Sequence, residues 1–141
     1  MQGLAAAMAG AREVVLYDRE ELALHCSLLS ARANGLATGA PPVPGPKAPP
    51  GLEDVFELQG GGRVEARFLD WADPSIDESF DVVMACDVLY EEYSVQPVAD
   101  VVPKLMAVGG RLLIADPPNR SACTLASSLA LLPLLEKHSK V

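Results

Sequence analysis

The sequence predicts an α/β protein, a Rossmann-like and mostly parallel doubly wound sheet, and three observations support this. Short apolar runs rich in β-forming residues alternate with segments of helical periodicity, which is the order that crossover connections between parallel strands produce. Several of these runs end in an acidic residue, and open α/β sheets bind ligands outside the carboxyl ends of their strands. Half of the 141 residues are hydrophobic, so the chain can form a packed core.

The first elements are a helix and a strand. Residues 3–9 are rich in alanine and are followed by Gly10, a residue that commonly ends helices. Residues 13–17 are rich in β-formers, and Asp18 follows them. We expect a short helix followed by a strand that carries an acid at its carboxyl end.

A longer helix and a proline-rich segment come next. Glu20 and Glu21 fall in the first turn of the predicted helix, where acids complement the helix dipole. Apolar residues then recur at helical spacing until Asn34-Gly35, namely Leu22, Cys26, Leu29 and Ala33. Residues 37–51 contain six prolines, which exclude both a helix and a central strand. We interpret 37–51 as a disordered or polyproline-like insertion in a surface loop; a proline-rich ligand for a partner domain is the alternative.

Three strand segments fill the middle of the chain. Residues 55–58 predict a short strand, and residues 63–69 alternate between apolar and charged side chains. That alternation is typical of an edge strand with one polar face, and Asp70-Trp71 closes it. Residues 80–85 end in an apolar run that predicts a strand buried on both faces.

The last part of the chain repeats the strand–helix–strand order. Residues 95–106 predict a helix that carries Pro103 late in its sequence. Residues 111–115 predict another buried strand, which ends at Asp116, and residues 123–135 predict a final apolar helix. The predicted inward side chains of the first of these helices are Val98, Val101, Val102 and Leu105.

Composition narrows the classes of function. The net charge of -8 argues against nucleic-acid and anionic-membrane partners, whose binding depends on basic surface. No apolar run approaches the length of a membrane span, and no basic region precedes the first apolar residues as in a secretory signal. Three widely spaced cysteines suit an intracellular, most simply cytoplasmic, protein without structural disulfides, and their spacing gives no metal site.

The acids at strand ends are the candidate site residues. In a parallel sheet the carboxyl ends of the strands share one rim, so the acids should line one crevice. The other interpretation is that each acid only caps a helix or forms a turn. The acids at or just past strand ends are Asp18, Asp70, Asp87 and Asp116.

Several segments together carry a resemblance to a known family. They are residues 3–11, residues 14–18 with Asn34-Gly35, Leu69-Asp-Trp71, Ala85-Cys-Asp-Val-Leu-Tyr90 and Gly109-Gly-Arg-Leu-Leu-Ile-Ala-Asp116. In this order the segments resemble the seven-strand S-adenosylmethionine-dependent methyltransferases of family 16, the lysine-methyltransferase-like group. The resemblance covers the chain except for the proline-rich insertion, and it implies that residues 1–141 are one partial methyltransferase domain. It also implies that the family's first strand, with its glycine-rich loop, and its last two strands lie outside these residues.

The resemblance implies a role for each cofactor-binding residue. Asp18 would accept hydrogen bonds from the ribose hydroxyls of S-adenosyl-L-methionine, and Gly3 would lie at the edge of the glycine-rich loop. Trp71 would pack against the adenine, with Asp70 near the adenine amino group. Cys86 would line the pocket through its backbone. Trp71 as an ordinary half-buried aromatic and Cys86 as a small buried residue are the alternatives.

The resemblance also implies the catalytic residues, Asp87 and Tyr90, which would face the methyl acceptor. The favoured acceptor is a lysine of a protein substrate, with a small-molecule amine as the other candidate. One competing hypothesis is a catalytically inactive remnant or protein-binding module of the same fold. Another is an unrelated dinucleotide enzyme, because Asp18 would equally suit the ribose of NAD.

Overall fold

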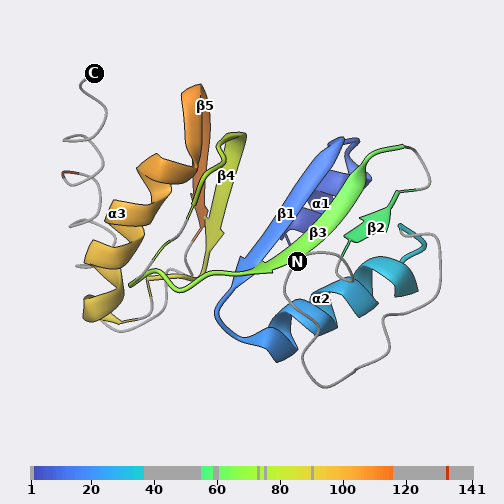
Figure 1. Ribbon diagram of the computed structural model, residues 1–141, viewed down its shortest axis with the longest axis horizontal. Helices are drawn as coiled ribbons and strands as arrows, with labels where there is room; N and C mark the ends of the chain where they lie inside the picture. Colours follow the sequence, from blue (N-terminus) through green and yellow to red (C-terminus); the bar gives the residue numbers. More distant parts are fainter. Residues whose placement is uncertain are drawn as a thin grey trace. The chain divides into compact units, whose positions relative to one another are not determined.

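The computed structural model describes residues 2–36, 55–58, 61–72, 74, 76–89, 91–115 and 133 of the chain. These residues divide into two compact units, Met1–Asp70 and Trp71–Val141, which are described one at a time (Figure 1). The proline-rich insertion at 37–51 lies outside the described residues, as does the last predicted helix at 123–135 except for Pro133.

The first unit contains two helices and a three-stranded sheet. In chain order its elements are α1 (Gln2–Met8), β1 (Glu13–Asp18), α2 (Glu21–Ala33), β2 (Val55–Glu57) and β3 (Arg63–Phe68). The strand order is β1-β3-β2, with β1 parallel and β2 antiparallel to β3. The polar alternation of residues 63–69 therefore belongs to the central strand of this sheet, and the predicted edge position is wrong.

One face of this sheet forms the core of the unit. Even-numbered residues of β1 and β3 pair across the sheet, as Val14 with Val64, and point to this face. Both α1 and α2 contribute to the same cluster, because Leu4 and Leu28 are buried in it. The buried members of this hydrophobic cluster are Leu4, Ala7, Val14, Leu24, Leu28, Ala31, Leu58, Val64 and Ala66.

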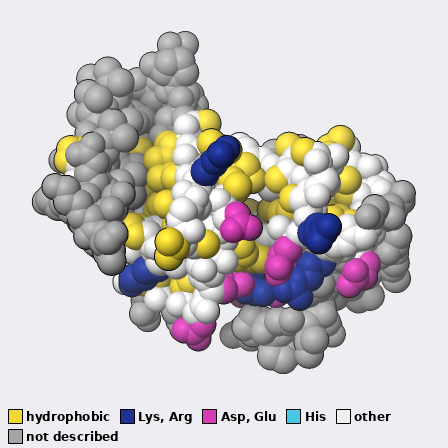
Figure 2. Space-filling model, turned by 90° about the horizontal axis from the view of Figure 1, so that it is seen from above, with side chains coloured by type: hydrophobic (Ala, Val, Ile, Leu, Met, Phe, Trp, Pro, Cys, Tyr) yellow, Lys and Arg dark blue, Asp and Glu magenta, His cyan; other side chains and the backbone are white. Residues whose placement is uncertain are grey.

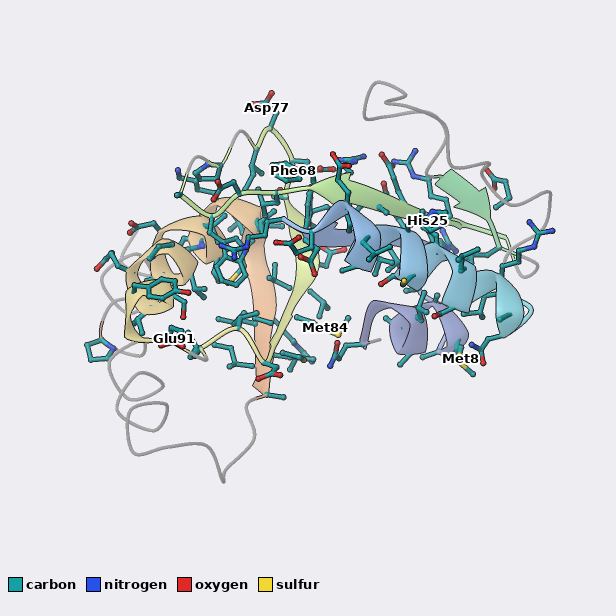
Figure 3. The ribbon with its side chains drawn as sticks, turned by 90° about the horizontal axis from the view of Figure 1, so that it is seen from below. Met8, His25, Phe68, Asp77, Met84 and Glu91 are labelled. Atoms are coloured by element: carbon teal, nitrogen blue, oxygen red, sulfur yellow. The ribbon has the colours of Figure 1, made fainter. Side chains whose placement is uncertain are left out.

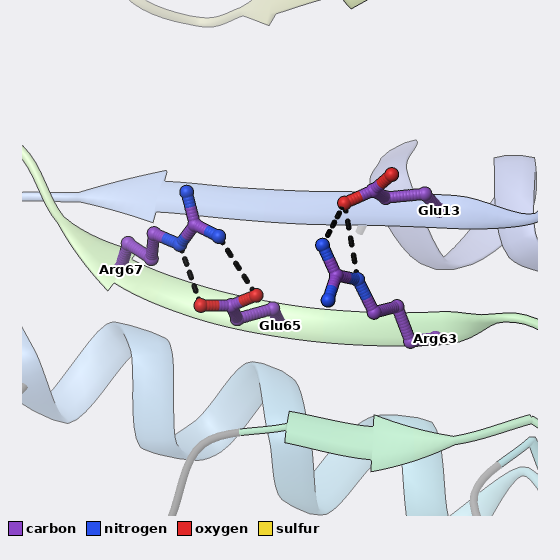
Figure 4. A network of polar contacts seen from close by, with 4 residues as sticks. All are labelled: Glu13, Arg63, Glu65 and Arg67. Atoms are coloured by element: carbon purple, nitrogen blue, oxygen red, sulfur yellow. Dashed lines mark hydrogen bonds and ion pairs between the residues drawn. The ribbon is translucent and has the colours of Figure 1, made fainter. Parts of the chain in front are cut away.

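The opposite face of the β1–β3 pair is charged (Figure 4). Glu13 and Arg63 are directly opposite in the register and form an ion pair. Glu65 and Arg67, two residues apart on β3, form two hydrogen bonds of 2.5 and 2.8 Å through both carboxylate oxygens. Glu65 is buried at 4% exposure, so this carboxylate relies on a charged partner within the chain.

The second unit contains a parallel strand–helix–strand motif. Its elements are β4 (Phe80–Cys86), a short 3₁₀ helix η1 (Glu92–Ser94), α3 (Val95–Leu105) and β5 (Met106–Ala115). The register runs from Val82 with Arg111 to Cys86 with Ala115, after an irregularity in which β5 carries extra residues around Gly109. Pro103 lies inside α3, and the helix continues past it to Leu105.

Helix α3 covers one face of the β4–β5 sheet. The predicted inward residues of α3, Val98, Val101, Val102 and Leu105, are all buried, which confirms that prediction. On β4 the buried side chains are Val83 and Ala85, whereas Val82 and Met84, which alternate with them, are 48% and 36% exposed. The prediction of burial on both faces is therefore wrong for this strand. Figure 2 shows hydrophobic side chains among the surface atoms of the described residues.

The α/β class is confirmed, with three α-helices and short sheets built on parallel pairs within the described residues. Each of the two parallel pairs has a helix between its strands in the chain, which is compatible with a Rossmann-like fold. The described strands form one three-stranded and one two-stranded sheet. A single doubly wound sheet stays a prediction.

Candidate functional site

Two of the predicted acids lie at the same edge of the first unit's sheet. Asp18 is the last residue of β1, and its backbone carbonyl accepts a 3.0 Å hydrogen bond from the N–H of Leu69. This bond extends the parallel ladder one residue beyond β3, and Asp70 follows directly. The carboxyl ends of neighbouring strands thus bring Asp18 and Asp70 to one edge, where α/β sheets hold ligands.

The side chain of Asp18 has a local partner. Its Oδ1 accepts a 2.9 Å hydrogen bond from the backbone N–H of Glu20, in the turn that leads into α2. This bond is of the kind that the turn-forming interpretation of the acid expects. A carboxylate has about four acceptor sites over its two oxygens. One backbone N–H therefore leaves acceptor capacity for ligand hydroxyls at the half-buried Asp18.

The end of β4 carries a special backbone conformation at Asp87. Its φ is 59°, and it is the one non-glycine residue with positive φ among the described residues. Its N–H donates a 2.9 Å hydrogen bond to the carbonyl of Ala115, so Asp87 closes the β4–β5 ladder. Left-handed backbone is uncommon outside glycine, although aspartate tolerates it, and it clusters at functional positions. The sequence carried no signal for this conformation.

The other predicted residues near these strand ends are only partly described. Asp70 is exposed, while Trp71 is half-buried at the start of the second unit. Cys86 is a half-buried free cysteine that ends β4. Tyr90 lies outside the described residues, one position after the fully buried Leu89. The two units are described separately, so a single rim that joins Asp18 and Asp70 to Asp87 stays a prediction.

Gly3 has a packing role in the structure. A β-carbon at this position would lie 2.3 Å from Cδ2 of Leu16 and 3.1 Å from Cγ1 of Val14. The missing side chain therefore lets α1 lie close against β1, which is one of the uses of glycine in nucleotide-binding folds. A part in cofactor binding stays a prediction.

Two further residues support the β1–β3 pair and were not singled out as site residues by the sequence. Gly62 has a φ of 103°, and a β-carbon there would lie 2.2 Å from the carbonyl oxygen of Arg12. Since the neighbouring Arg63 N–H donates a 2.7 Å bond to the same oxygen, Gly62 starts the β1–β3 ladder. Glu65 is the other, because alternation places it on a polar face without indicating its burial.

The described residues show one perturbed pKa, no candidate metal site and no candidate membrane span. The hydrogen bond and charge of Glu13 raise the pKa of Arg63 above its ordinary value. No group of three or more His, Cys, Asp or Glu within the described residues could hold a metal ion. None of the helices that the structure describes is long and apolar enough to cross a membrane.

Comparison with protein-family models, with curated proteins and with solved structures found no match for this chain. The methyltransferase resemblance therefore depends on the motifs in the sequence and on the positions of their residues.

Proposed function

We propose that this chain binds S-adenosyl-L-methionine and takes part in methyl transfer to a protein lysine. The observation that carries the proposal is the edge at which β1 and β3 end together, with Asp18 on one strand and Asp70 following the other. Cofactor ribose carries two hydroxyl donors, and a carboxylate at such an edge is an acceptor-only group suited to them. The three widely spaced cysteines favour a reducing, intracellular setting for this reaction.

The proposed cofactor contacts follow the resemblance. Asp18 accepts hydrogen bonds from the ribose hydroxyls, and Asp70 accepts from the adenine amino group. The indole of Trp71 packs against the adenine, and the backbone at Cys86 lines the pocket. Gly3 acts through the close packing of α1 on β1, since a β-carbon there would displace Leu16.

The proposed chemistry is an in-line displacement. The lone pair of the lysine amine forms the new N–C bond while the bond from the methyl carbon to the sulfonium sulfur breaks, leaving a neutral thioether. Because the leaving group is good, catalysis needs mainly alignment and removal of water. Asp87 holds and orients the amine, and Tyr90 contacts the substrate beside it.

The acceptor amine must reach the reaction without its proton. An unperturbed lysine amine has a pKa of about 10.4, and a neighbouring carboxylate favours the charged form. Asp87 is therefore assigned an orienting role, and the amine proton leaves to solvent before the displacement.

The test is a calorimetric titration of the full chain with S-adenosylhomocysteine, with circular dichroism on the same sample. Wild type should bind saturably, and Asp18→Ala should abolish binding. The matched variant is Asp18→Asn, which retains an oxygen for the Glu20 N–H but replaces the second acceptor by a donor. Loss of binding in a folded Asp18→Asn chain supports the cofactor role.

Two other results would contradict the proposal. Full binding by Asp18→Asn would reduce Asp18 to a turn-forming residue. Saturable binding of NAD, without binding of S-adenosylhomocysteine, would favour the dinucleotide enzyme that Asp18 equally suits.

The second candidate is a catalytically inactive, protein-binding module of the same fold. The exposure of Val82, Met84 and Leu113 favours it, because a contiguous apolar sheet face is suited to cover by another protein. A folded chain that gives no heat with S-adenosylhomocysteine would support this candidate over the methyltransferase.

A further inference from the structure

The sheet face that α2 covers opens toward its carboxyl edge. Alternate residues of a strand point to one face, and along this face of β3 the exposed fraction rises from 0% at Val64 and 4% at Ala66 to 53% at Phe68. The first buried residue of α2 is Leu24, which shares a hydrophobic cluster with Val64 and Ala66. Phe68 lies beyond this cluster, so the helix leaves the end of β3 uncovered.

Asp18 is the neighbour of Phe68 at this open end. The two residues are Cα partners in the parallel register of β1 and β3, so their Cα atoms lie about 4.8 Å apart and their side chains point to the same face. The carboxylate of Asp18 accepts its hydrogen bond from the N–H of Glu20, directly before α2. This bond keeps the carboxylate on the α2 side, with the ring of Phe68. Figure 3 labels Phe68 where β3 ends.

The combination of these two side chains indicates a ligand. Exposed apolar side chains that occur singly are ordinary on protein surfaces. Phe68, however, is the one exposed aromatic among the side chains that the structure describes in the first unit. It lies beside an acceptor at the edge where α/β sheets hold ligands. This edge therefore offers a flat apolar surface next to a carboxylate with acceptor capacity.

A nucleoside has two parts that match this arrangement. Its ribose carries hydroxyl donors, and its base is a flat ring system joined directly to the ribose at C1′. A carboxylate accepts hydrogen bonds from hydroxyls, and aromatic side chains stack on bases. One ligand can therefore contact both side chains at once, without a residue of the second unit.

We propose that Phe68 is the base-stacking residue of an adenosine subsite in the first unit, where Asp18 holds the ribose. The inference rests on the proposed function, which gives Asp18 its ribose-binding role. The resemblance gives the adenine to Trp71, so Phe68 is an additional stacking residue. Both contacts involve only the base and the ribose, and the subsite therefore takes the adenosine portion of a ligand whatever group that portion carries.

The first test is calorimetric titration of the full chain with adenosine and, separately, with S-adenosylhomocysteine. Wild type should bind both saturably. Phe68→Ala should weaken the binding of both ligands by about 10-fold, because it removes a stacking ring. Phe68→Tyr keeps the ring and should bind within about twofold of wild type.

The matched control is Met8→Ala, which also removes an exposed apolar side chain from the first unit. Met8 ends α1 shortly before β1 begins, so it lies toward the amino end of that strand, whereas Asp18 is at the carboxyl end. Met8→Ala should bind both ligands as wild type does. Circular dichroism on each variant checks that the chain is folded.

The second test observes the ring of Phe68 by nuclear magnetic resonance. The chain contains three phenylalanines, so a sample with isotope-labelled phenylalanine rings gives few signals. The signals that Phe68→Tyr removes belong to Phe68. Adenosine should shift these signals and give nuclear Overhauser contacts between the ring and the adenine protons.

The outcomes separate this inference from the proposed function. Equal binding of S-adenosylhomocysteine by wild type and Phe68→Ala would overturn the stacking role and leave the proposed function in place. Equal weakening by Phe68→Tyr and Phe68→Ala would also overturn it, because the tyrosine variant retains the ring. Phe68-dependent binding of adenosine, without binding of S-adenosylhomocysteine, would support the subsite and contradict methyl transfer. A folded wild-type chain that binds neither ligand would contradict both.

Discussion

The two units differ in the sheet face that their helices do not cover. In the first unit this face of the β1–β3 pair carries the Glu13–Arg63 and Glu65–Arg67 ion pairs. In the second unit the face away from α3 carries Val82, Met84 and Leu113, with Met84 and Leu113 adjacent in the register. Paired charges satisfy one another within the chain on the first face, whereas parallel strands with an apolar face are usually covered on both sides.

The difference indicates where each unit depends on further protein. The first unit satisfies its outer face with its own charges and has a core contributed by both helices. The second unit has a two-stranded sheet and one α-helix in the described residues, and the sheet face away from α3 leaves apolar side chains exposed. We expect the first unit to be the more self-sufficient of the two.

The largest expected effect is on the first unit at Gly62. Gly62→Ala should destabilise by about 3 kcal/mol, because it combines a positive φ with contact of the new β-carbon on the Arg12 carbonyl. Gly61→Ala is the matched control, with a φ of 81° and no atom within 4 Å of the new β-carbon. It should cost about 1 kcal/mol. Denaturant unfolding followed by circular dichroism checks both, and equal losses would contradict the close approach.

The next effect tests the charged face of the first unit. Glu65→Gln should cost about 2 kcal/mol, because it removes a buried carboxylate that makes two charge-assisted hydrogen bonds to Arg67. A double-mutant cycle with Arg67→Gln measures the coupling between the two side chains. Coupling near zero would mean that the charged face contributes little to the self-sufficiency of this unit.

A smaller effect is expected at the end of β4. Asp87→Val should cost about 1–2 kcal/mol, since a β-branched residue tolerates a φ of 59° poorly, while Asp87→Gly should retain the fold. The two variants remove the same carboxylate, so both should lose the proposed methyl transfer alike. Equal stability of the two variants in thermal unfolding would argue against the left-handed conformation.

The apolar face of the second unit should tolerate polar substitution. Leu113→Gln should change the free energy of unfolding by only about 0.5 kcal/mol, because the side chain is 55% exposed. The same change should reduce binding of a hydrophobic dye. Val83→Gln is the matched contrast, at 9% exposure on the α3 side, and should cost about 2 kcal/mol. Equal costs would show that both faces are covered.

The smallest effect concerns the exposed Glu13–Arg63 pair. Arg63→Gln should change the free energy of unfolding least of these variants, because an exposed ion pair contributes little to stability. The ion pair with Glu13 raises the pKa of Arg63 in the folded chain. The stability that this pair contributes is therefore fully present below the pKa of Arg63 in the unfolded chain, and it is lost only as pH rises through its pKa in the folded chain. Unfolding of wild type and Arg63→Gln should therefore differ by a constant amount from pH 6 to about pH 9. If the difference in unfolding free energy between the two chains varied with pH in this window, the raised pKa of Arg63 would be contradicted.

Periodicity in the sequence predicted most of the element order. Helix α3 was predicted with its inward residues, because Val98, Val102 and Leu105 recur at a spacing that only a helix places on one side. The sequence predicts a strand at residues 63–69, but it does not predict that this strand lies at the centre of its sheet. Alternation indicates that a strand has one polar face, whereas the pairing of its edges depends on β2, a partner from elsewhere in the chain.

The burial of individual side chains and the backbone conformation could be predicted less well than the order of helices and strands. Val82 and Val83 are equally apolar, and which of them is covered depends on the side on which α3 packs. For the candidate site, the strand-end positions of Asp18 and Asp70 followed from the apolar runs before them. The left-handed φ of Asp87 did not, because aspartate adopts both signs of φ in turns.

Of the five strands that the structure describes, β3 alone is paired along both edges. Its amide hydrogens should therefore exchange with solvent only when the whole unit opens, whereas those of β4 and β5 exchange through smaller local openings. Asp70 follows this slowest-exchanging strand, and Asp87 follows a strand of the two-stranded sheet. Asp70, one of the residues proposed to hold the cofactor, thus follows a rigid support, while Asp87, proposed to orient the acceptor, has more freedom to adjust.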